Sequence, residues 1–163
     1  SELIGHLASL GHKRIAFLSG PKESWQQRER ARAVLHASNF GISVEEIPTG
    51  GSIAAGVQAL DVAMQAKPTA AICFNDLVAL GVLSRAAELG IRVPEDLSVT
   101  GFDDIEFSSF SNPPLTTIRS PQIALGEMAW KVLEDQLSGK PGNHQPLMGA
   151  EVVIRSSTGE SRK

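Results

Sequence analysis

Residues 92–104 read Arg-Val-Pro-Glu-Asp-Leu-Ser-Val-Thr-Gly-Phe-Asp-Asp, and this stretch is the strongest single indication of the fold. Residues 97–100 form a short, mainly apolar run between turn residues, which is typical of a strand buried in a parallel sheet. Asp103 and Asp104 come just past the carboxyl end of this strand, which we expect to be a central one. Open parallel sheets bind ligands at that edge, because loops and helix N-termini converge there.

Strand-like and helix-like patterns alternate along the chain on both sides of this stretch. Short apolar runs predict strands at residues 14–18, 44–47 and 70–74, and amphipathic stretches predict helices at 26–38, 52–66 and 77–89. Ser52 is the expected N-cap of the second of these helices, and Asn75 or Asp76 that of the third. The order predicts an α/β fold, a parallel sheet with helices on both faces joined by right-handed crossovers.

The pattern changes after residue 112. The pair Pro113-Pro114 forces an extended segment, residues 116–118 are strand-like, and Ser120-Pro121 offers an N-cap and a first-turn proline for a helix that reaches residue 137. A last strand is predicted at residues 152–154. The helix carries an apolar stripe made of Leu125, Met128, Val132 and Leu133. Exposure of that stripe would cost several kcal/mol at about 25 cal/mol per Å², so we expect it to pack on a second copy of the chain or to fold back on the sheet.

Five blocks of sequence resemble, in order and spacing, the effector-binding region of the LacI/GalR family of bacterial transcription regulators. They are residues 10–17 (LGHKRIAF), 74–81 (FNDLVALG), 92–104, 112–121 (NPPLTTIRSP) and 153–158 (VIRSST). The resemblance implies a periplasmic-binding-protein-like fold of type I, with an effector held between two lobes. It assigns residues 1–114 and 150–158 to the second lobe, and 115–140 to a crossover strand and a helix that packs on the first lobe. Residues 1–163 match neither the first lobe nor the DNA-binding headpiece of the family, so we expect the chain to be a fragment.

Two charged residues are the main candidates for contact with the effector. Asp103 is the stronger, because a carboxylate accepts hydrogen bonds from two vicinal hydroxyls of a sugar. The alternative is that Asp103 caps the helical turn that begins at Asp104. The resemblance puts Arg30 in the cleft, whereas composition alone makes it one more solvated charge between Arg28 and Arg32.

Three other side chains are weaker candidates. Asn75 matches an asparagine that family members use on ligand hydroxyls, or it only caps the following helix. Trp25 either lays its indole on the apolar face of a sugar or is an exposed loop residue. Ser120 either approaches the ligand between the lobes or is only an N-cap.

The turn Gly50-Gly51-Ser52 departs from the family, which often has an aromatic residue there that stacks on the sugar ring. A glycine-rich turn before a helix offers bare backbone N–H groups, which suit a carboxylate or a phosphate. A sugar acid or a phosphorylated sugar is therefore a candidate ligand beside a neutral sugar. The alternative is that Gly50-Gly51 is a plain turn.

Composition limits the classes of function. With 163 residues, 42% hydrophobic and 20% charged, the chain is typical of one soluble domain with a real core. Its formal net charge of −3 argues against a nucleic-acid surface, which needs clustered Lys and Arg, so any DNA contact is expected through a headpiece. Cys73 lies within an apolar run and is expected to be buried rather than reactive. No apolar run approaches the roughly 18 residues of a membrane helix, and the resemblance implies a cytoplasmic protein.

The sequence shows no catalytic constellation. Its four histidines are scattered, and it contains no Gly-x-Gly-x-x-Gly motif, P-loop or metal-ligand cluster. We therefore expect no enzyme and no cofactor, but the effector-sensing module of a LacI-type DNA-binding regulator, most often a repressor. The alternative is a periplasmic sugar-binding protein of a transporter, which shares the fold; the crossover at 114–118 and the ending Arg155-Ser-Ser-Thr158 favour the regulator.

Phe107 and Phe110 are expected at a homodimer interface, because the family dimerises through this lobe and grouped exposed aromatics imply a partner.

Overall fold

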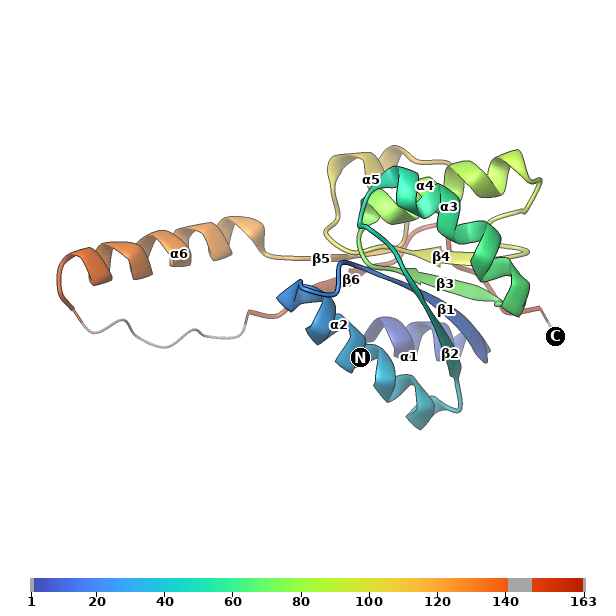
Figure 1. The fold of residues 1–163 in the computed structure, drawn as a ribbon, viewed down its shortest axis with the longest axis horizontal. Helices are drawn as coiled ribbons and strands as arrows, with labels where there is room; N and C mark the ends of the chain where they lie inside the picture. Colours follow the sequence, from blue (N-terminus) through green and yellow to red (C-terminus); the bar gives the residue numbers. More distant parts are fainter. Residues whose placement is uncertain (1, 141–147, 163) are drawn as a thin grey trace.

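The computed structural model describes residues 2–140 and 148–162, and its body is a parallel sheet covered by helices on both faces (Figure 1). The strand order is β2-β1-β3-β4, with β1 at Arg14–Ser19, β2 at Ser43–Pro48, β3 at Ala70–Cys73 and β4 at Ser98–Thr100. Helices α1 (Glu2–Ser9) and α2 (Trp25–Leu35) cover one face, and α3 (Ile53–Ala63) and α4 (Asp76–Glu88) cover the other. The predicted α/β architecture is confirmed.

Alternate residues of β1 enter two separate cores, because successive side chains of a strand point to opposite faces. Ile15 and Phe17 pack with α1 and α2, whereas Ala16 and Leu18 belong to the larger core beneath α3 and α4. The predicted burial of Cys73 is confirmed, and burial raises the pKa of its thiol. Both faces of the central strands are thus sealed, which leaves their carboxyl edge for polar chemistry.

Helix boundaries follow local capping. Ser52 Oγ accepts the N–H of Ala55, and Asn75 Oδ1 accepts the N–H of Val78, so the predicted caps are confirmed. The helix expected over residues 26–38 instead ends at Leu35 and continues as a 3-10 turn, His36–Phe40.

One expectation about the sheet is wrong. β4 is the last strand of the four-stranded sheet, not a central one. Its carboxyl end is flanked on the outer side by the crossover segment, because the N–H of Gly101 donates to the carbonyl of Thr116 at 2.9 Å. Asp103 and Asp104, which follow β4, therefore lie between the sheet and the crossover.

The crossover is a two-stranded antiparallel ribbon of β5 (Thr117–Arg119) and β6 (Glu151–Val153), preceded by the short helix α5 (Glu106–Phe110). Beyond β5, helix α6 (Gln122–Leu137) extends away from the body (Figure 1). The N-cap position of α6 is taken by Pro121, so the prediction of Ser120 as its cap is wrong.

Every side chain of α6 is at least partly exposed, including Leu125 at 45% and Leu133 at 47%. The idea that α6 folds back on its own sheet is therefore wrong for the single chain, since β5 and β6 carry it past the sheet edge. Packing on a second copy stays a prediction.

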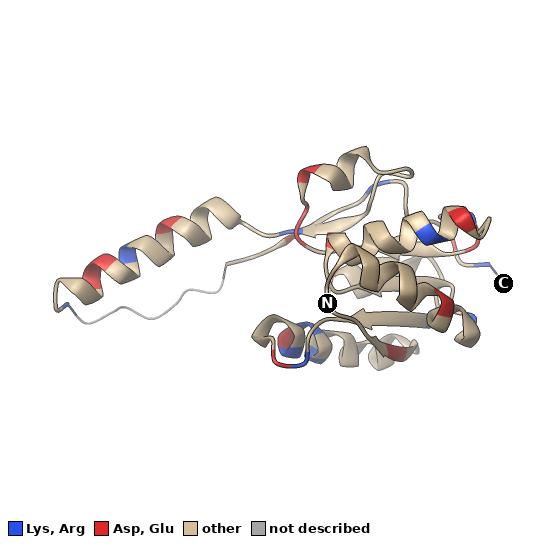
Figure 2. Cartoon of the chain, turned by 45° about the horizontal axis from the view of Figure 1, so that its top comes forward, with Lys and Arg blue, Asp and Glu red and all other residues tan. Residues whose placement is uncertain are grey.

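Acidic and basic residues are interspersed over the body and along α6 rather than gathered by sign (Figure 2). Among the described residues, the helices all fall short of the length and hydropathy that a bilayer crossing requires.

Candidate functional site

A clamped arginine lies at the carboxyl edge of the sheet, where the segments after β1, β3 and β4 meet. The Cζ atom of Arg30, on α2, is 4.6 Å from the ring centre of Phe74 and 3.6 Å from that of Phe102. Its Nη1 donates to the carbonyl of Phe74, and its Nη2 lies 3.4 Å from Oδ1 of Asp103. Only 18% of the Arg30 side chain is exposed, so its interpretation as a solvated surface charge is wrong.

The glycine that follows β1 allows the aromatic clamp to form. A Cβ atom on Gly20 would lie 2.5 Å from the ring of Phe74, too close for the ring to stay in place, whereas one on Gly51 would make only ordinary contact with that ring at 3.7 Å. The loop at Gly20 is held by the buried side chain of Gln27, whose Oε1 accepts the Gly20 N–H at 2.7 Å. Ser24 caps α2 by accepting the N–H of Gln27. Bonds from side chains to backbone N–H groups therefore fix the start of the helix that carries Arg30.

Burial shifts the pKa values of both members of the Arg30–Asp103 pair. Burial raises the pKa of Asp103 and lowers the pKa of Arg30, and in each case the other member of the pair opposes the shift. Arginine stays protonated nonetheless. The Asp103 side chain is 35% exposed, so its carboxylate keeps open lone pairs. An accepting carboxylate beside a donor fork fixed on aromatic rings can recognise vicinal hydroxyls and ring oxygens.

Asp103 is not a helix cap. The N-cap residue of α5 is Ile105. The side chains that bond this turn belong to Asp104, whose Oδ1 accepts from the Ser108 hydroxyl at 3.1 Å, and to Asp76, whose Oδ2 accepts the N–H of Ile105 at 2.9 Å. The capping alternative is therefore wrong for Asp103. Its role as a ligand contact stays a prediction.

Asn75 makes one hydrogen bond within the fold at each end of its amide, and its contact with a ligand stays a prediction. Besides capping α4, its Nδ2 donates to the carbonyl of Gly51 at 3.0 Å. The N–H of Gly51 in turn lies 3.4 Å from Oγ1 of Thr49. Thr49 therefore supplies an acceptor for the N–H of Gly51. The hypothesis that this turn binds a carboxylate or a phosphate needs that N–H to be free for the ligand.

Trp25 and Ser120 line the same groove, of about 590 Å³, with Phe102 and the face of α6 that carries Met128 and Val132. Trp25 is 62% exposed at the start of α2. Both candidates thus lie beside the aromatic clamp, on the side toward α6. Their contact with a ligand stays a prediction.

Phe107 and Phe110 lie on α5 and are 68% and 79% exposed. The expectation that this segment faces solvent is confirmed. Dimerisation through it stays a prediction.

Sequence reasoning missed the aromatic pair and a buried carboxylate. Phe74 and Phe102 each follow a strand, in Phe-Asn-Asp and Gly-Phe-Asp-Asp, and this shared position was the available signal. Asp76 is fully buried; its Oδ1 accepts from the Thr117 hydroxyl at 2.6 Å and its Oδ2 from the N–H of Ile105 at 2.9 Å. Burial raises its pKa against the effect of these two hydrogen bonds.

Comparisons with known proteins agree on the kind of domain. A family model described as a periplasmic binding protein-like domain matches residues 4–158. The chain is 38% identical to the HTH-type transcriptional repressor CytR of Escherichia coli strain K12, over 96% of this chain and 48% of that protein. It resembles the LacI family transcriptional regulator from Enterococcus faecium with bound ribose (TM-score 0.90, 27% identity, 99% of this chain and 62% of that one). It also resembles the dimeric Lac repressor with an 11-residue C-terminal deletion (TM-score 0.88, 32% identity, 98% and 60%).

The chain spans about half the length of the curated relatives that it matches. These relatives are transcriptional regulators, not enzymes, and a transporter binding protein is not favoured. The chain belongs to the periplasmic binding protein-like domain family, in the form carried by LacI-family transcriptional regulators.

Proposed function

We propose that the chain is the second lobe of the effector-binding domain of a cytoplasmic LacI-type repressor. Residues 1–114 and 150–158 form this lobe, and residues 115–140 cross to a first lobe, on which α6 packs. The observation in favour is that β5 and β6 leave the body as a ribbon and present α6 with every side chain at least partly exposed. The length of the relatives, about twice that of this chain, also supports it.

The effector is a small sugar or sugar acid, and the Arg30–Asp103 pair is its main contact in this lobe. The support is geometric, since a partly exposed carboxylate lies beside a guanidinium that two rings already hold in place. Little side-chain entropy is lost when such a preorganised pair binds. Trp25, Asn75 and Ser120 are secondary contacts around it.

Effector binding changes DNA affinity by selecting one arrangement of the two lobes. A ligand shifts such an equilibrium only by the difference between its affinities for the two states. DNA itself is contacted by a headpiece outside residues 1–163. The lobe dimerises through α5, where Phe107 and Phe110 offer exposed aromatic surface.

Calorimetry on the longer regulator tests the proposal. We would titrate a panel of neutral monosaccharides and aldonic acids into the wild type and into Asp103→Asn. The variant should bind the tightest panel member at least about tenfold more weakly, as expected for lost hydrogen bonds to a charged group. Asp61→Asn is the matched control, because Asp61 pairs with Arg85 on the opposite side of the sheet. Equal affinity of Asp103→Asn and wild type, or an absence of binding by every panel member, contradicts the proposal.

A further inference from the structure

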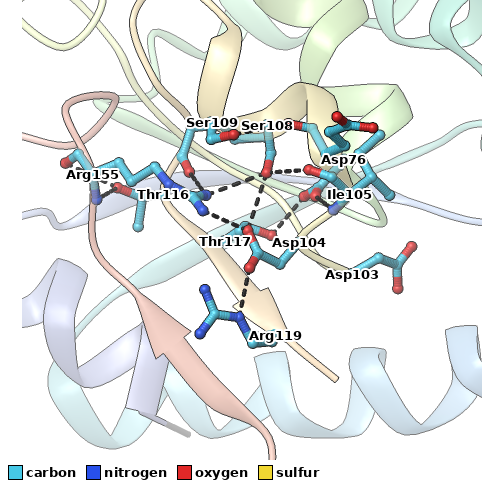
Figure 3. Close-up of polar contacts among 12 residues, drawn as sticks. Asp76, Asp103, Asp104, Ile105, Ser108, Ser109, Thr116, Thr117, Arg119 and Arg155 are labelled. Atoms are coloured by element: carbon cyan, nitrogen blue, oxygen red, sulfur yellow. Dashed lines mark hydrogen bonds and ion pairs between the residues drawn. The ribbon is translucent and has the colours of Figure 1, made fainter. Parts of the chain in front are cut away.

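A second polar network lies directly behind the ligand-facing pair, around Asp104 (Figure 3). Its Oδ1 accepts from Nη2 of Arg155 at 2.7 Å, and its Oδ2 accepts from Nε of Arg119 at 2.7 Å. Arg119 ends β5, and Arg155 follows β6. One carboxylate therefore joins the strand by which the chain leaves the lobe to the segment by which it returns. We call Asp104, Arg119 and Arg155 the Asp104 clasp.

The neighbouring Asp103 is bonded to the same crossover through its backbone. Its N–H donates to the carbonyl of Ile118 at 2.9 Å, and it forms an isolated parallel bridge with Arg119. In Figure 3 the Asp103 carboxylate points away from the network and that of Asp104 points into it. The two adjacent residues thus face opposite directions: the Asp103 carboxylate faces the proposed effector site, and the Asp104 carboxylate bonds to the crossover.

The conformation of this turn is one that surrounding contacts must maintain. Asp103 has a φ of 115° and Asp104 a φ of 55°. Residues other than glycine adopt such angles at a cost, and they persist where neighbouring structure fixes them. The clasp supplies that structure, because the Asp104 side chain is only 9% exposed and is met by two arginines.

Arg155 is itself held on several sides. Its Nη1 donates to the carbonyl of Leu115 at 2.8 Å and to the Ser108 hydroxyl at 3.2 Å, and its side chain is 17% exposed. Short charge-assisted bonds weaken steeply with distance and angle. A shift of β5 relative to β6 would therefore break one of the two bonds to Asp104 or turn its carboxylate.

We propose that Asp104, through the clasp, is a positioning residue that couples the direction of the Asp103 carboxylate to the placement of β5 and β6. The inference rests on the proposed function only in that Asp103 contacts the effector. Movement of the crossover changes the direction of the Asp103 carboxylate. In return, binding of the effector by Asp103 favours one placement of the crossover, because coupling of this kind is reciprocal.

Amide-resolved hydrogen exchange on the 163-residue chain tests the coupling from the crossover side. Arg119→Met removes one arm of the clasp and should speed exchange of the Asp103 amide by about fivefold or more relative to the amides of β1 and β3, which report global stability. Arg119→Lys keeps a charge that reaches Asp104 and should restore most of the protection. Arg85→Met, which breaks the Arg85–Asp61 pair between α4 and α3, is the matched control.

The reverse direction uses the ligand-facing side. Arg30→Met removes the partner of the Asp103 carboxylate, and the β5 and β6 amides should then change their exchange rates by about threefold relative to β1 and β3. If Arg119→Met alters only the β5 and β6 amides, or if Arg30→Met leaves them at wild-type rates, the coupling is refuted and the clasp is only a structural ion pair. Should Arg119→Met not fold, Arg119→Gln, which also removes the charge that pairs with Asp104 but stays polar at this half-exposed position, carries the same test with the same two outcomes.

These measurements involve no effector. If the exchange experiment refutes the coupling, effector binding by Asp103 can still hold. If calorimetry instead shows no role for Asp103 in binding, the exchange result would still show the coupling, although Asp103 would have no effector to contact.

Discussion

The Thr117 hydroxyl on β5 donates a 2.6 Å hydrogen bond to Oδ1 of Asp76, a carboxylate that is fully buried at the start of α4. The other oxygen accepts the N–H of Ile105. Three segments that are far apart in sequence therefore meet on one acidic side chain. The contact also leaves no room at Gly101, where a Cβ atom would lie 2.1 Å from Oδ1 of Asp76.

Asp76→Asn should reduce the loss of stability that occurs as pH rises. The folded-state pKa of Asp76 is raised by burial above its unfolded value of about 3.9. Its contribution to stability is therefore complete below that value and is lost as pH rises through the folded pKa. Urea unfolding at a series of pH values from 4 upward should show that the free energy of unfolding of Asp76→Asn rises relative to that of the wild type as pH increases. An unchanged difference across the series would contradict this account of Asp76.

Asp104→Asn should show the opposite dependence. Burial raises the pKa of Asp104, but hydrogen bonds from Arg155, Arg119 and Ser108 outweigh it, and the net pKa is lowered. The stability that Asp104 contributes is present above its unfolded pKa of about 3.9 and is lost as pH falls through the folded value. We expect a cost of about 3 kcal/mol near pH 7 for the broken buried pair, shrinking toward zero in acid. A constant cost at all pH values would mean that charge plays no part.

Gly20→Ala should displace the aromatic clamp. The added Cβ would enter the ring of Phe74, so the ring must move, at a cost of about 1–3 kcal/mol for overpacking. Chemical unfolding gives that cost, and NMR shifts of the Arg30 side-chain protons report the loss of ring contact. The matched control is Gly126→Ala, which meets open space on α6. Unshifted Arg30 resonances in a stable Gly20→Ala protein would show that Phe74 does not hold the arginine.

The stripe on α6 should make the 163-residue chain self-associate. Leu125, Met128, Val132 and Leu133 leave apolar area in water worth about 25 cal/mol per Å², so a second copy should cover them at high concentration. Sedimentation equilibrium should give a mass that rises with concentration in the wild type and falls to that of a monomer in Met128→Glu/Val132→Glu. Glu127→Gln is the control on the same helix. A wild-type chain that stays monomeric with α6 ordered would contradict this prediction.

Much of the fold follows from sequence because local signals agree with it. Apolar runs predict the strands, and Ser52 and Asn75 are predicted and observed as caps. The place of β4 at the sheet edge could not be predicted, since strand order depends on long-range pairing that no local pattern encodes.

The site was only partly predictable for a similar reason. Family resemblance singles out Arg30 and Asp103, but the clamp by Phe74 depends on the absence of a side chain at Gly20, in another loop. The clasp joins Asp104 to arginines 15 and 51 positions away. Such contacts arise from the meeting of β5 and β6, which neither sequence segment reveals alone.

A crystal structure of the longer regulator bound to the tightest ligand of the sugar panel would show directly whether Arg30 and Asp103 hold the effector. We predict ligand oxygens within about 2.7–3.2 Å of the Asp103 carboxylate and the Arg30 guanidinium, with α6 packed on the first lobe. A ligand bound elsewhere, or a first lobe that leaves α6 exposed, would contradict it.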